Sequence, residues 1–338
     1  MKLLPSHCHI RLLFGVFLSG VLGSFLCAES GQTEASTDLD RKVTETLPKI
    51  ADYAQEAMDR IGVIGLGRMG AAMAARFAGQ GLPVTGWTRS GRSVEAVAQA
   101  PDLAGLTAAS DVLVTSLYDD AAVAEVLDAL LACDLSGKLI LETSTVVPGV
   151  VKARAGQIAA AGASICDAPI SGGPELVAAG RCGIFIGGED AAAARATAAL
   201  VPLSDRIFHV GPLGSGLVMK VVNNALMQSY TAGLVEQLQL AARAGLPLET
   251  ALTILCSGPA GLPMVRDRLP RIFGQDSSVG FPVSGGAKDN DVFRRVAAEA
   301  GVATPTLDAF KTVLEDALAA GLADDDIAAL MRRGYRDG

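Results

Sequence analysis

Short apolar runs alternate with longer alanine-rich stretches between residue 60 and about residue 211. A short apolar run between turn signals is typical of a buried strand, and a longer stretch with helical periodicity is typical of a helix that covers a sheet. The pattern predicts strands at residues 60–65, 83–88, 111–116, 138–142, 164–168, 183–187 and 206–210, with helices at 69–80, 92–99, 120–131, 148–161 and 190–201.

The alternation stops near residue 211, and the rest of the chain shows helical signals alone. Strands that are apolar throughout indicate a parallel sheet with helices on both faces. The predicted fold class is therefore α/β, with an N-terminal Rossmann-type doubly wound sheet over residues 59–214 and an all-helical C-terminal domain over 215–338. In that domain, helices are predicted at residues 215–244, 248–256, 285–300, 304–319 and 324–332.

The first 58 residues differ in character from the rest of the chain. Residues 12–28 form an uncharged, mostly apolar run behind Lys2 and Arg11, which is typical of a signal peptide or a short membrane anchor. Met58 stands just before the first predicted strand, so a third interpretation is a translation start at that residue. Residues 1–58 are accordingly interpreted as a leader and linker, with these three alternatives open.

Composition excludes several classes of protein. Apolar residues make up 50% of the 338 positions, which excludes disorder for most of the chain. The net charge is −8 and basic residues form no long run, so nucleic acid is not an expected partner. We expect no metal site, because the cysteines form no CxxC pair and His209 is the one histidine beyond the leader. We interpret the cysteines as isolated buried thiols and His209 as a structural residue at a strand end.

A glycine-rich loop, GLGRMG at residues 65–70, follows the first predicted strand and opens an alanine-rich helix. In this setting the first glycine allows a tight turn, the second lets a pyrophosphate approach the backbone, and the third lets helix and strand pack closely. The loop therefore predicts a dinucleotide site at a helix N-terminus. The expected cofactor contacts here are Gly65, Leu66, Gly67, Arg68, Met69 and Gly70.

The end of the second predicted strand indicates which dinucleotide binds. An NAD site usually has an acidic residue about 20 residues past the loop, yet no acid stands between Gly70 and Glu95. Arg89 and Arg92 stand there instead, and a guanidinium pairs well with a 2′-phosphate. We therefore expect NADP(H) in preference to NAD(H); the alternative is that both arginines are simply solvated.

Lys220 and Asn224 are the candidate catalytic pair. They stand four residues apart near the start of the predicted helix 215–244, so they share one helix face. The helix N-terminus disfavours an ammonium and can lower the pKa of Lys220, which suits a proton donor to a carbonyl. Asn224 can hydrogen-bond both the lysine and a substrate oxygen. The turn at residues 171–173 (Ser-Gly-Gly) offers hydrogen-bond donors for a substrate carboxylate.

Taken in order, these motifs resemble the β-hydroxyacid dehydrogenases, which include 3-hydroxyisobutyrate dehydrogenase and tartronate semialdehyde reductase. The resemblance covers residues 60–335 and rests on GLGRMG, on LETSTVVPG at 141–149, on DAPISGG at 167–173, on the glycine–lysine–asparagine pattern at 214–224, and on Lys288-Asp289. It implies interconversion of a small 3-hydroxy acid and its semialdehyde with a nicotinamide cofactor. It also implies a 6-phosphogluconate dehydrogenase-like C-terminal domain.

The resemblance assigns a role to each matching residue. Lys220 becomes the catalytic acid/base and Asn224 its partner, while Ser171, Gly172 and Gly173 bind the carboxylate end of the substrate. Lys288 lies over the active site and contacts substrate and cofactor, and Thr145 lies near the nicotinamide. We also assign Ser116 and Leu117 to the cofactor site. Leu217, Met264 and Phe281 are candidate walls of the substrate pocket.

The resemblance further implies a homodimer or homotetramer that associates through the helical domain. A nicotinamide-dependent enzyme needs the cytoplasmic cofactor pool, so the start at Met58 and a cytoplasmic location are favoured over export or membrane anchoring. Two other functions stay open: an imine reductase and a catalytically inactive NADP-binding scaffold protein. Relatives of both kinds are expected to lack the lysine, so Lys220 argues against them.

Overall fold

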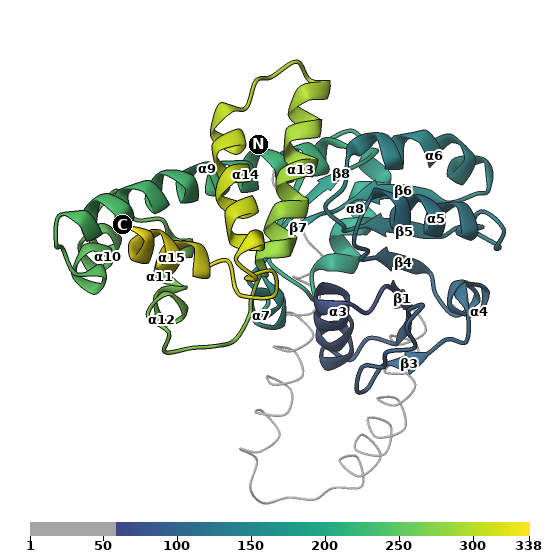
Figure 1. Ribbon diagram of the computed structural model, residues 1–338. Coiled ribbons are helices and arrows are strands. Elements are labelled where there is room, and N and C mark those ends of the chain that lie inside the picture. Colours follow the sequence, from purple (N-terminus) through teal and green to yellow (C-terminus); the bar gives the residue numbers. More distant parts are fainter. Residues whose placement is uncertain (1–58) are drawn as a thin grey trace, which may run out of the picture. The chain divides into compact units, whose positions relative to one another are not determined.

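A nine-stranded sheet forms the N-terminal half of residues 59–338, the part of the chain that the computed structural model describes (Figure 1). Each strand is short and apolar, and several are buried over their whole length. The strands are β1 (Ile61–Ile64), β2 (Val84–Trp87), β3 (Ala98–Gln99), β4 (Val112–Thr115), β5 (Leu139–Glu142), β6 (Ser164–Asp167), β7 (Ile170–Ser171), β8 (Gly183–Gly187) and β9 (Arg206–Gly211).

The strand order is β3-β2-β1-β4-β5-β6-β8-β7, and β9 pairs with β8. The first six strands of this order are parallel, whereas β8 runs antiparallel to β6 and β7. The order reverses at β1, which lies between β2 and β4, and ligands of doubly wound sheets bind at such a point. The predicted Rossmann-type sheet is therefore confirmed, and antiparallel pairing is added at one end, where β8 joins β6 and β7.

Helices cover both faces of the sheet, and each face carries its own apolar core. One core includes Met73 and Phe77 of α3, and the other includes Leu127 of α5 and Ile158 of α6. The covering helices are α3 (Arg68–Gly79), α4 (Leu103–Ala108), α5 (Asp120–Leu130), α6 (Pro148–Ala160), α7 (Pro174–Ala178) and α8 (Asp190–Leu200).

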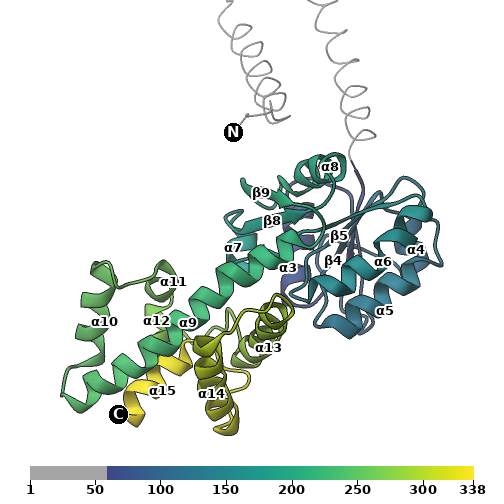
Figure 2. The same ribbon diagram turned by 90° about the horizontal axis from the view of Figure 1, so that it is seen from above.

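The C-terminal half is helical, as predicted, and is organised along the long helix α9 (Ser215–Arg243). Helix α9 begins against β8 and β9 and continues into the helical region, where other helices pack along it (Figure 2). The remaining helices are α10 (Leu248–Ser257), α11 (Pro263–Arg266), α12 (Leu269–Ile272), α13 (Val283–Glu299), α14 (Pro305–Ala319) and α15 (Ala329–Asp337).

A small apolar core joins the helical region to the sheet. Phe293 of α13 is 0% exposed and packs in one cluster with Val221 of α9 and Val147 of the β5–α6 loop. Beside this core, the buried Gln228 donates to the carbonyl oxygen of Gly286 (3.1 Å) and accepts from Asn290 (2.9 Å). These directional bonds fix the register of α13 on α9.

Two predicted elements differ from the structure. The helix predicted at 92–99 is wrong, because these residues turn and then form β3 on the open edge of β2. Burial of Val97 and pairing with β2 outweigh the helix propensity of this segment. The helix predicted at 324–332 begins later, at Ala329, because the buried carboxylate of Asp326 binds the backbone N–H groups of Gly280, Phe281 and Ala328 and so holds a loop.

The interpretations of residues 1–58, including the apolar run 12–28 and the start at Met58, lie outside the described residues. Between residues 59 and 338, no helix has the length and apolar character needed to cross a bilayer.

Phe293→Ala tests the core that joins the two halves. Deleting a fully buried phenyl ring is expected to lower the free energy of unfolding by about 3–5 kcal/mol, measured by urea denaturation. Val302→Ala is the control, since Val302 is 58% exposed and a surface change of this kind is expected to alter stability by less than about 0.5 kcal/mol. Equal effects of the two substitutions would contradict the packing described.

Candidate active site

The candidate site lies where the carboxyl ends of β1, β4, β5 and β6 meet. These strands are consecutive parallel neighbours, so the loops that follow them share one edge of the sheet. The predicted cofactor loop follows β1, and the predicted carboxylate turn begins at the end of the short strand β7, which comes just after β6. The structure thus brings together residues that are more than 100 positions apart in the sequence.

The loop 65–70 has the geometry of an anion-binding turn. Gly65 adopts a φ of +92°, and a Cβ atom at Gly70 would collide with the carbonyl oxygen of Gly65. A Cβ atom at Gly67 meets no heavy atom within 4 Å among the described residues. The first turn of α3 has no acidic side chain and no side-chain cap. The positive end of the helix is therefore open to an anion, and the loop fits a pyrophosphate.

Two of the other side chains of this loop, Leu66 and Met69, pack against the protein, whereas Arg68 is exposed. Leu66 is 1% exposed, and Met69 packs against the core beneath α3. The Arg68 guanidinium donates to the carbonyl oxygen of Gly280 at 3.3 Å, which ties the loop to the helical region. The loop can therefore offer a ligand its backbone and the exposed Arg68 side chain.

Ser116 and Leu117 lie beside the glycine loop. The Ser116 N–H donates to the carbonyl oxygen of Ile64 (2.8 Å), and the Leu117 N–H donates to Ser144 Oγ (2.8 Å). These bonds align the β4–α5 loop with the end of β1 and with the β5–α6 loop. Three of the predicted cofactor segments therefore share one place.

Arg89 and Arg92 follow β2, away from Lys220 in the sheet order. Arg89 pairs with Glu125 at 2.7 Å, and both side chains are more than half exposed. An exposed pair of this kind contributes little to stability, so Arg89 can exchange its partner for a phosphate at low cost. Arg92 is exposed.

Lys220 lies in the second turn of α9 and is 6% exposed. Its Nζ donates to the carbonyl oxygen of Ile170 at 2.5 Å. Burial lowers the pKa of Lys220 to about 8; Lys288 adds to this shift, and Asp289 opposes it. The expected direction of the pKa shift is present, but its largest cause is burial rather than the helix N-terminus. The amine can therefore gain and lose a proton near neutral pH.

Asn223 was missed from the sequence, although it stands beside the predicted Asn224. Its Nδ2 donates to Ser171 Oγ (2.9 Å) and to Asn224 Oδ1 (2.8 Å). Within the described residues, no hydrogen bond joins Asn224 to Lys220. Asn223 thus connects the carboxylate turn with Asn224, and the double asparagine in the motif was the signal for it.

The turn 171–173 is also close to the helical region. A Cβ atom at Gly173 would lie 3.7 Å from the carbonyl oxygen of Gly280, and Gly172 has a φ of +128°. Glu175, in the next turn, pairs with Arg271 at 2.8 Å. The predicted carboxylate turn therefore lies between the sheet and the loop that precedes α13.

Lys288 of α13 reaches the β5–α6 loop. Its Nζ donates to the carbonyl oxygen of Thr145 (2.5 Å) and pairs with Asp289 (3.0 Å). It also lies 5.9 Å from the centre of the Tyr118 ring. Lys288 is thus beside two predicted cofactor segments, and it is close enough to Lys220 to affect its pKa.

A carboxylate holds the start of α9. Asp167, at the end of β6, is 0% exposed and accepts from the N–H groups of Gly214 (2.6 Å) and Leu217 (2.7 Å). A side chain at Gly216 would collide with the carbonyl oxygen of Phe185, so the glycine permits this close approach. The sequence showed Asp167 within a motif but did not indicate this structural role.

The three candidate wall residues of the substrate pocket pack in three different places. Leu217 is wrong as a wall residue, because it is 1% exposed and packs in the core between the sheet and the helices α5 and α6. Met264 is partly buried against α10 and α15, and Phe281 is partly buried against α14.

His209 lies within β9, two residues before its end, and its Nε2 lies 2.9 Å from the carbonyl oxygen of Gly188 and 3.1 Å from that of Gly211. The expectation of buried thiols holds for Cys166, Cys182 and Cys256 but is wrong for Cys133, which is only partly buried. The four cysteines of residues 59–338 are free thiols. No cluster of three metal-ligating side chains occurs within the same range.

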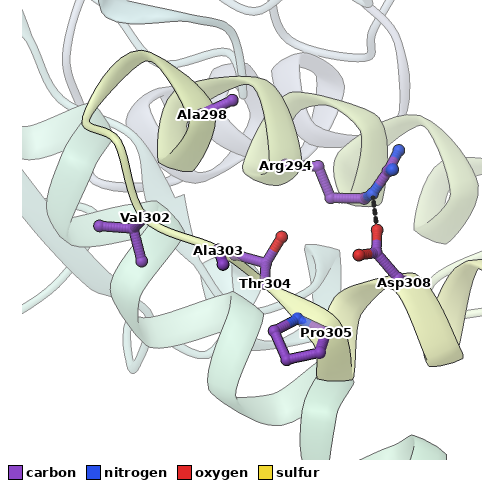
Figure 3. A pocket seen from close by; sticks show the side chains of 7 residues that line it. All are labelled: Arg294, Ala298, Val302, Ala303, Thr304, Pro305 and Asp308. Carbon is purple, nitrogen blue, oxygen red and sulfur yellow. Dashed lines mark hydrogen bonds and ion pairs between the residues drawn. The ribbon is translucent and has the colours of Figure 1, made fainter.

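A pocket of about 380 Å³ lies elsewhere, where α13 ends and α14 begins (Figure 3). Arg294 and Asp308 face each other in it at 2.6 Å and satisfy each other's charge. Its lining residues include none of the predicted site residues, so it does not bear on the chemistry at Lys220.

Comparison with known families agrees with this geometry. Residues 60–211 match the family described as the NAD binding domain of 6-phosphogluconate dehydrogenase. Residues 214–333 match the family described as NAD-binding of NADP-dependent 3-hydroxyisobutyrate dehydrogenase. The two matches meet at the start of α9.

Individual relatives match this chain over nearly their whole length. The chain is 30% identical to the 2-(hydroxymethyl)glutarate dehydrogenase of Eubacterium barkeri over 81% of this chain and 94% of that protein. It is 28% identical to an NAD-dependent L-serine dehydrogenase of Pseudomonas aeruginosa over 81% of this chain and 97% of that protein. The structure of a Mycobacterium tuberculosis 3-hydroxyisobutyrate dehydrogenase with L-serine superposes on this structure with a TM-score of 0.74 at 25% sequence identity. The superposition covers 82% of this chain and 99% of that one.

One family accounts for the glycine loop at the end of β1 and the buried lysine of α9. The 30% identity over 94% of the Eubacterium barkeri enzyme indicates the same family. The chain belongs to the β-hydroxyacid dehydrogenase family of NAD(P)-dependent enzymes.

Proposed function

We propose that this chain interconverts a small 3-hydroxy acid and its semialdehyde, of the 3-hydroxyisobutyrate or 2-hydroxy-3-oxopropionate type, with NADP(H) as the preferred cofactor. The observation that carries the proposal is the buried amine of Lys220 against the carbonyl oxygen of Ile170, one residue before the carboxylate turn. The substrates named for the relatives support it, since each combines a carboxylate with a hydroxymethyl group.

Several segments are assigned to the cofactor. The loop 65–70 holds the pyrophosphate through its backbone, and Arg89 and Arg92 bind the 2′-phosphate. Ser116, Leu117 and Thr145 line the nicotinamide end, and Lys288 closes over it. When bound, the nicotinamide supplies or accepts the hydride.

The chain's own residues position the substrate and move a proton. Ser171, Gly172 and Gly173 hold the substrate carboxylate, and Lys288 adds a positive charge above it. Lys220 Nζ gives a proton to the substrate oxygen in reduction and takes it back in oxidation. Asn224, held by Asn223, orients that oxygen. Burial of Lys220 keeps bulk water from competing for its proton.

The assay of function measures absorbance of NADPH and of NADH with a panel of small semialdehydes, imines and no substrate. We expect turnover with a semialdehyde that carries a carboxylate, and faster turnover with NADPH. Turnover of imines alone would contradict the proposed reaction, and no turnover with any substrate would favour a binding protein.

Lys220→Ala is expected to lower kcat by about 10²–10⁴-fold, since a positioned acid/base contributes this much. Cofactor affinity, measured by titration of NADPH fluorescence, is expected to stay within about twofold of wild type. Lys311→Ala, at a surface lysine paired with Glu315, serves as the matched control with unchanged kcat. A Lys220→Ala enzyme within about tenfold of the wild-type kcat would refute the assignment.

The pH dependence is expected to have opposite signs in the two directions. The pKa of Lys220 is about 8, so the ammonium that donates in reduction predominates below this pH. The neutral amine that accepts in oxidation predominates above it. Initial rates are therefore expected to fall for reduction and rise for oxidation as pH increases through about 8. The same sign in both directions would contradict a lysine acid/base.

Gly67→Ala and Gly70→Ala separate ligand binding from folding. Gly67→Ala fills open space, so we expect unchanged thermal stability without cofactor and weaker NADPH binding. Gly70→Ala meets the Gly65 carbonyl oxygen, so we expect lower thermal stability even without cofactor. Calorimetry with and without NADPH measures both. Equal NADPH affinity in Gly67→Ala and wild type would remove the loop from the cofactor site.

Arg89→Ala/Arg92→Ala tests the preference for NADP(H). Loss of a charge-assisted contact to the 2′-phosphate is expected to raise the Kd for NADPH about tenfold or more, with little change for NADH. Arg243→Ala, at an exposed arginine of α9, is the control. An equal loss for both cofactors would mean that the arginines do not read the 2′-phosphate.

A further inference from the structure

We infer that Glu142 is a positioning residue: a buried, protonated carboxyl group that ties the β4–α5 loop to the β5–α6 loop beside the cofactor site. The inference rests on the proposed function for what these loops hold. It concerns a residue that the reaction itself does not use.

Glu142 is surrounded on both sides by neighbouring strands. It is the last residue of β5 and is 0% exposed. In register it faces Thr115 of β4 on one side and Asp167 of β6 on the other. Side chains in register on parallel strands point to the same face, and neighbouring strands lie about 4.8 Å apart. Two carboxyl groups thus lie side by side with no access to water.

Two adjacent buried carboxyl groups do not both ionise readily. Asp167 is the better place for the negative charge, because it accepts two backbone N–H bonds at the positive end of α9. Burial raises the pKa of Asp167, while these N–H bonds and Lys152 of α6 oppose that shift. Glu142 also accepts hydrogen bonds, from Ser144 and Thr115, and these lower its pKa, but burial outweighs them. Burial first, and then the charge of Asp167, raises the pKa of Glu142 to about 7.

The hydroxyl of Thr115 can donate to an ionised Glu142 and can equally accept from a protonated one. Thr115 Oγ1 lies 2.5 Å from Glu142 Oε2 and 3.3 Å from the carbonyl oxygen of Leu141. A hydroxyl has one hydrogen to give. If Thr115 donates to Leu141, the contact with Glu142 requires a proton on Oε2. A protonated Glu142 therefore satisfies the carboxyl group, the Thr115 hydroxyl and the Leu141 carbonyl oxygen at once.

The second oxygen of Glu142 organises the neighbouring loop. Oε1 accepts from the Ser144 N–H at 2.6 Å, and Ser144 Oγ accepts from the Leu117 N–H at 2.8 Å. The next residue, Thr145, receives Lys288 on its carbonyl oxygen. One buried acid therefore connects Leu117, Thr145 and Lys288. Ionisation strengthens acceptance from Ser144, but it also places a second buried charge beside Asp167, and we expect this repulsion to displace the loop contacts.

Infrared spectroscopy of the full chain tests the protonation state. At about pH 6, wild type is expected to show the carbonyl stretch of a buried protonated carboxyl group, which disappears as pH rises through about 7. The band is expected to be lost in Glu142→Gln and kept in Glu236→Gln, the same change at an exposed glutamate of α9. No band in the difference spectrum between wild type and Glu142→Gln would overturn the inference.

Thr115→Val keeps the test decisive if Glu142→Gln does not fold. Without the hydroxyl, the acid O–H loses its acceptor and the carbonyl stretch is expected to move to higher frequency. An unchanged band position would overturn the inference.

NADPH titrations test the positioning role. Between about pH 6 and pH 8.5, wild type is expected to lose affinity several-fold more than Glu142→Gln. Glutamine cannot ionise, yet it can donate to Thr115 and accept from Ser144. Equal pH dependence in wild type, Glu142→Gln and Glu236→Gln would contradict the role. Neither readout uses substrate, so a failure of the proposed reaction and a failure of this inference are distinguishable.

Discussion

The carboxylate of Asp167 is the contact on which the site depends. It closes the first turn of α9 by accepting from Gly214 and Leu217, and it stands at the end of β6. A buried charge is tolerated there because the helix dipole and two N–H groups compensate it. Since α9 is thereby fixed to the sheet, Lys220 in its second turn comes to lie against Ile170, beside the carboxylate turn.

Burial then gives the lysine its chemistry. An ammonium with a single carbonyl acceptor and almost no water is less favourable than an exposed one, so its pKa falls toward neutrality. Lys288 and Asp289, on α13, adjust this value in opposite directions. The apolar core around Phe293 and the Gln228–Asn290 bond keep α13 in place. Packing between α13 and α9 thus contributes to the pKa of Lys220.

The sequence predicted those features that depend on local signals. The strands, the glycine loop and the lysine helix each have a pattern within a short window, and all are present in the structure. The edge strand β3 was mistaken for a helix because its pairing with β2 is a tertiary effect. The pairing of Glu142 with Thr115 and Asp167 depends on strand register, which no single motif shows. The role of Asn223 could not be predicted, because the sequence does not show which of the two adjacent asparagines bonds to Ser171.

The most direct measurement is the titration of the Lys220 amine itself. Competitive labelling of amines over a range of pH, followed by mass spectrometry of the peptide that contains Lys220, reports its pKa without substrate. The account predicts a midpoint near 8, well below the ordinary lysine value of 10.5. A midpoint at the ordinary value would mean that the amine is solvated, and it would contradict the central role given to burial.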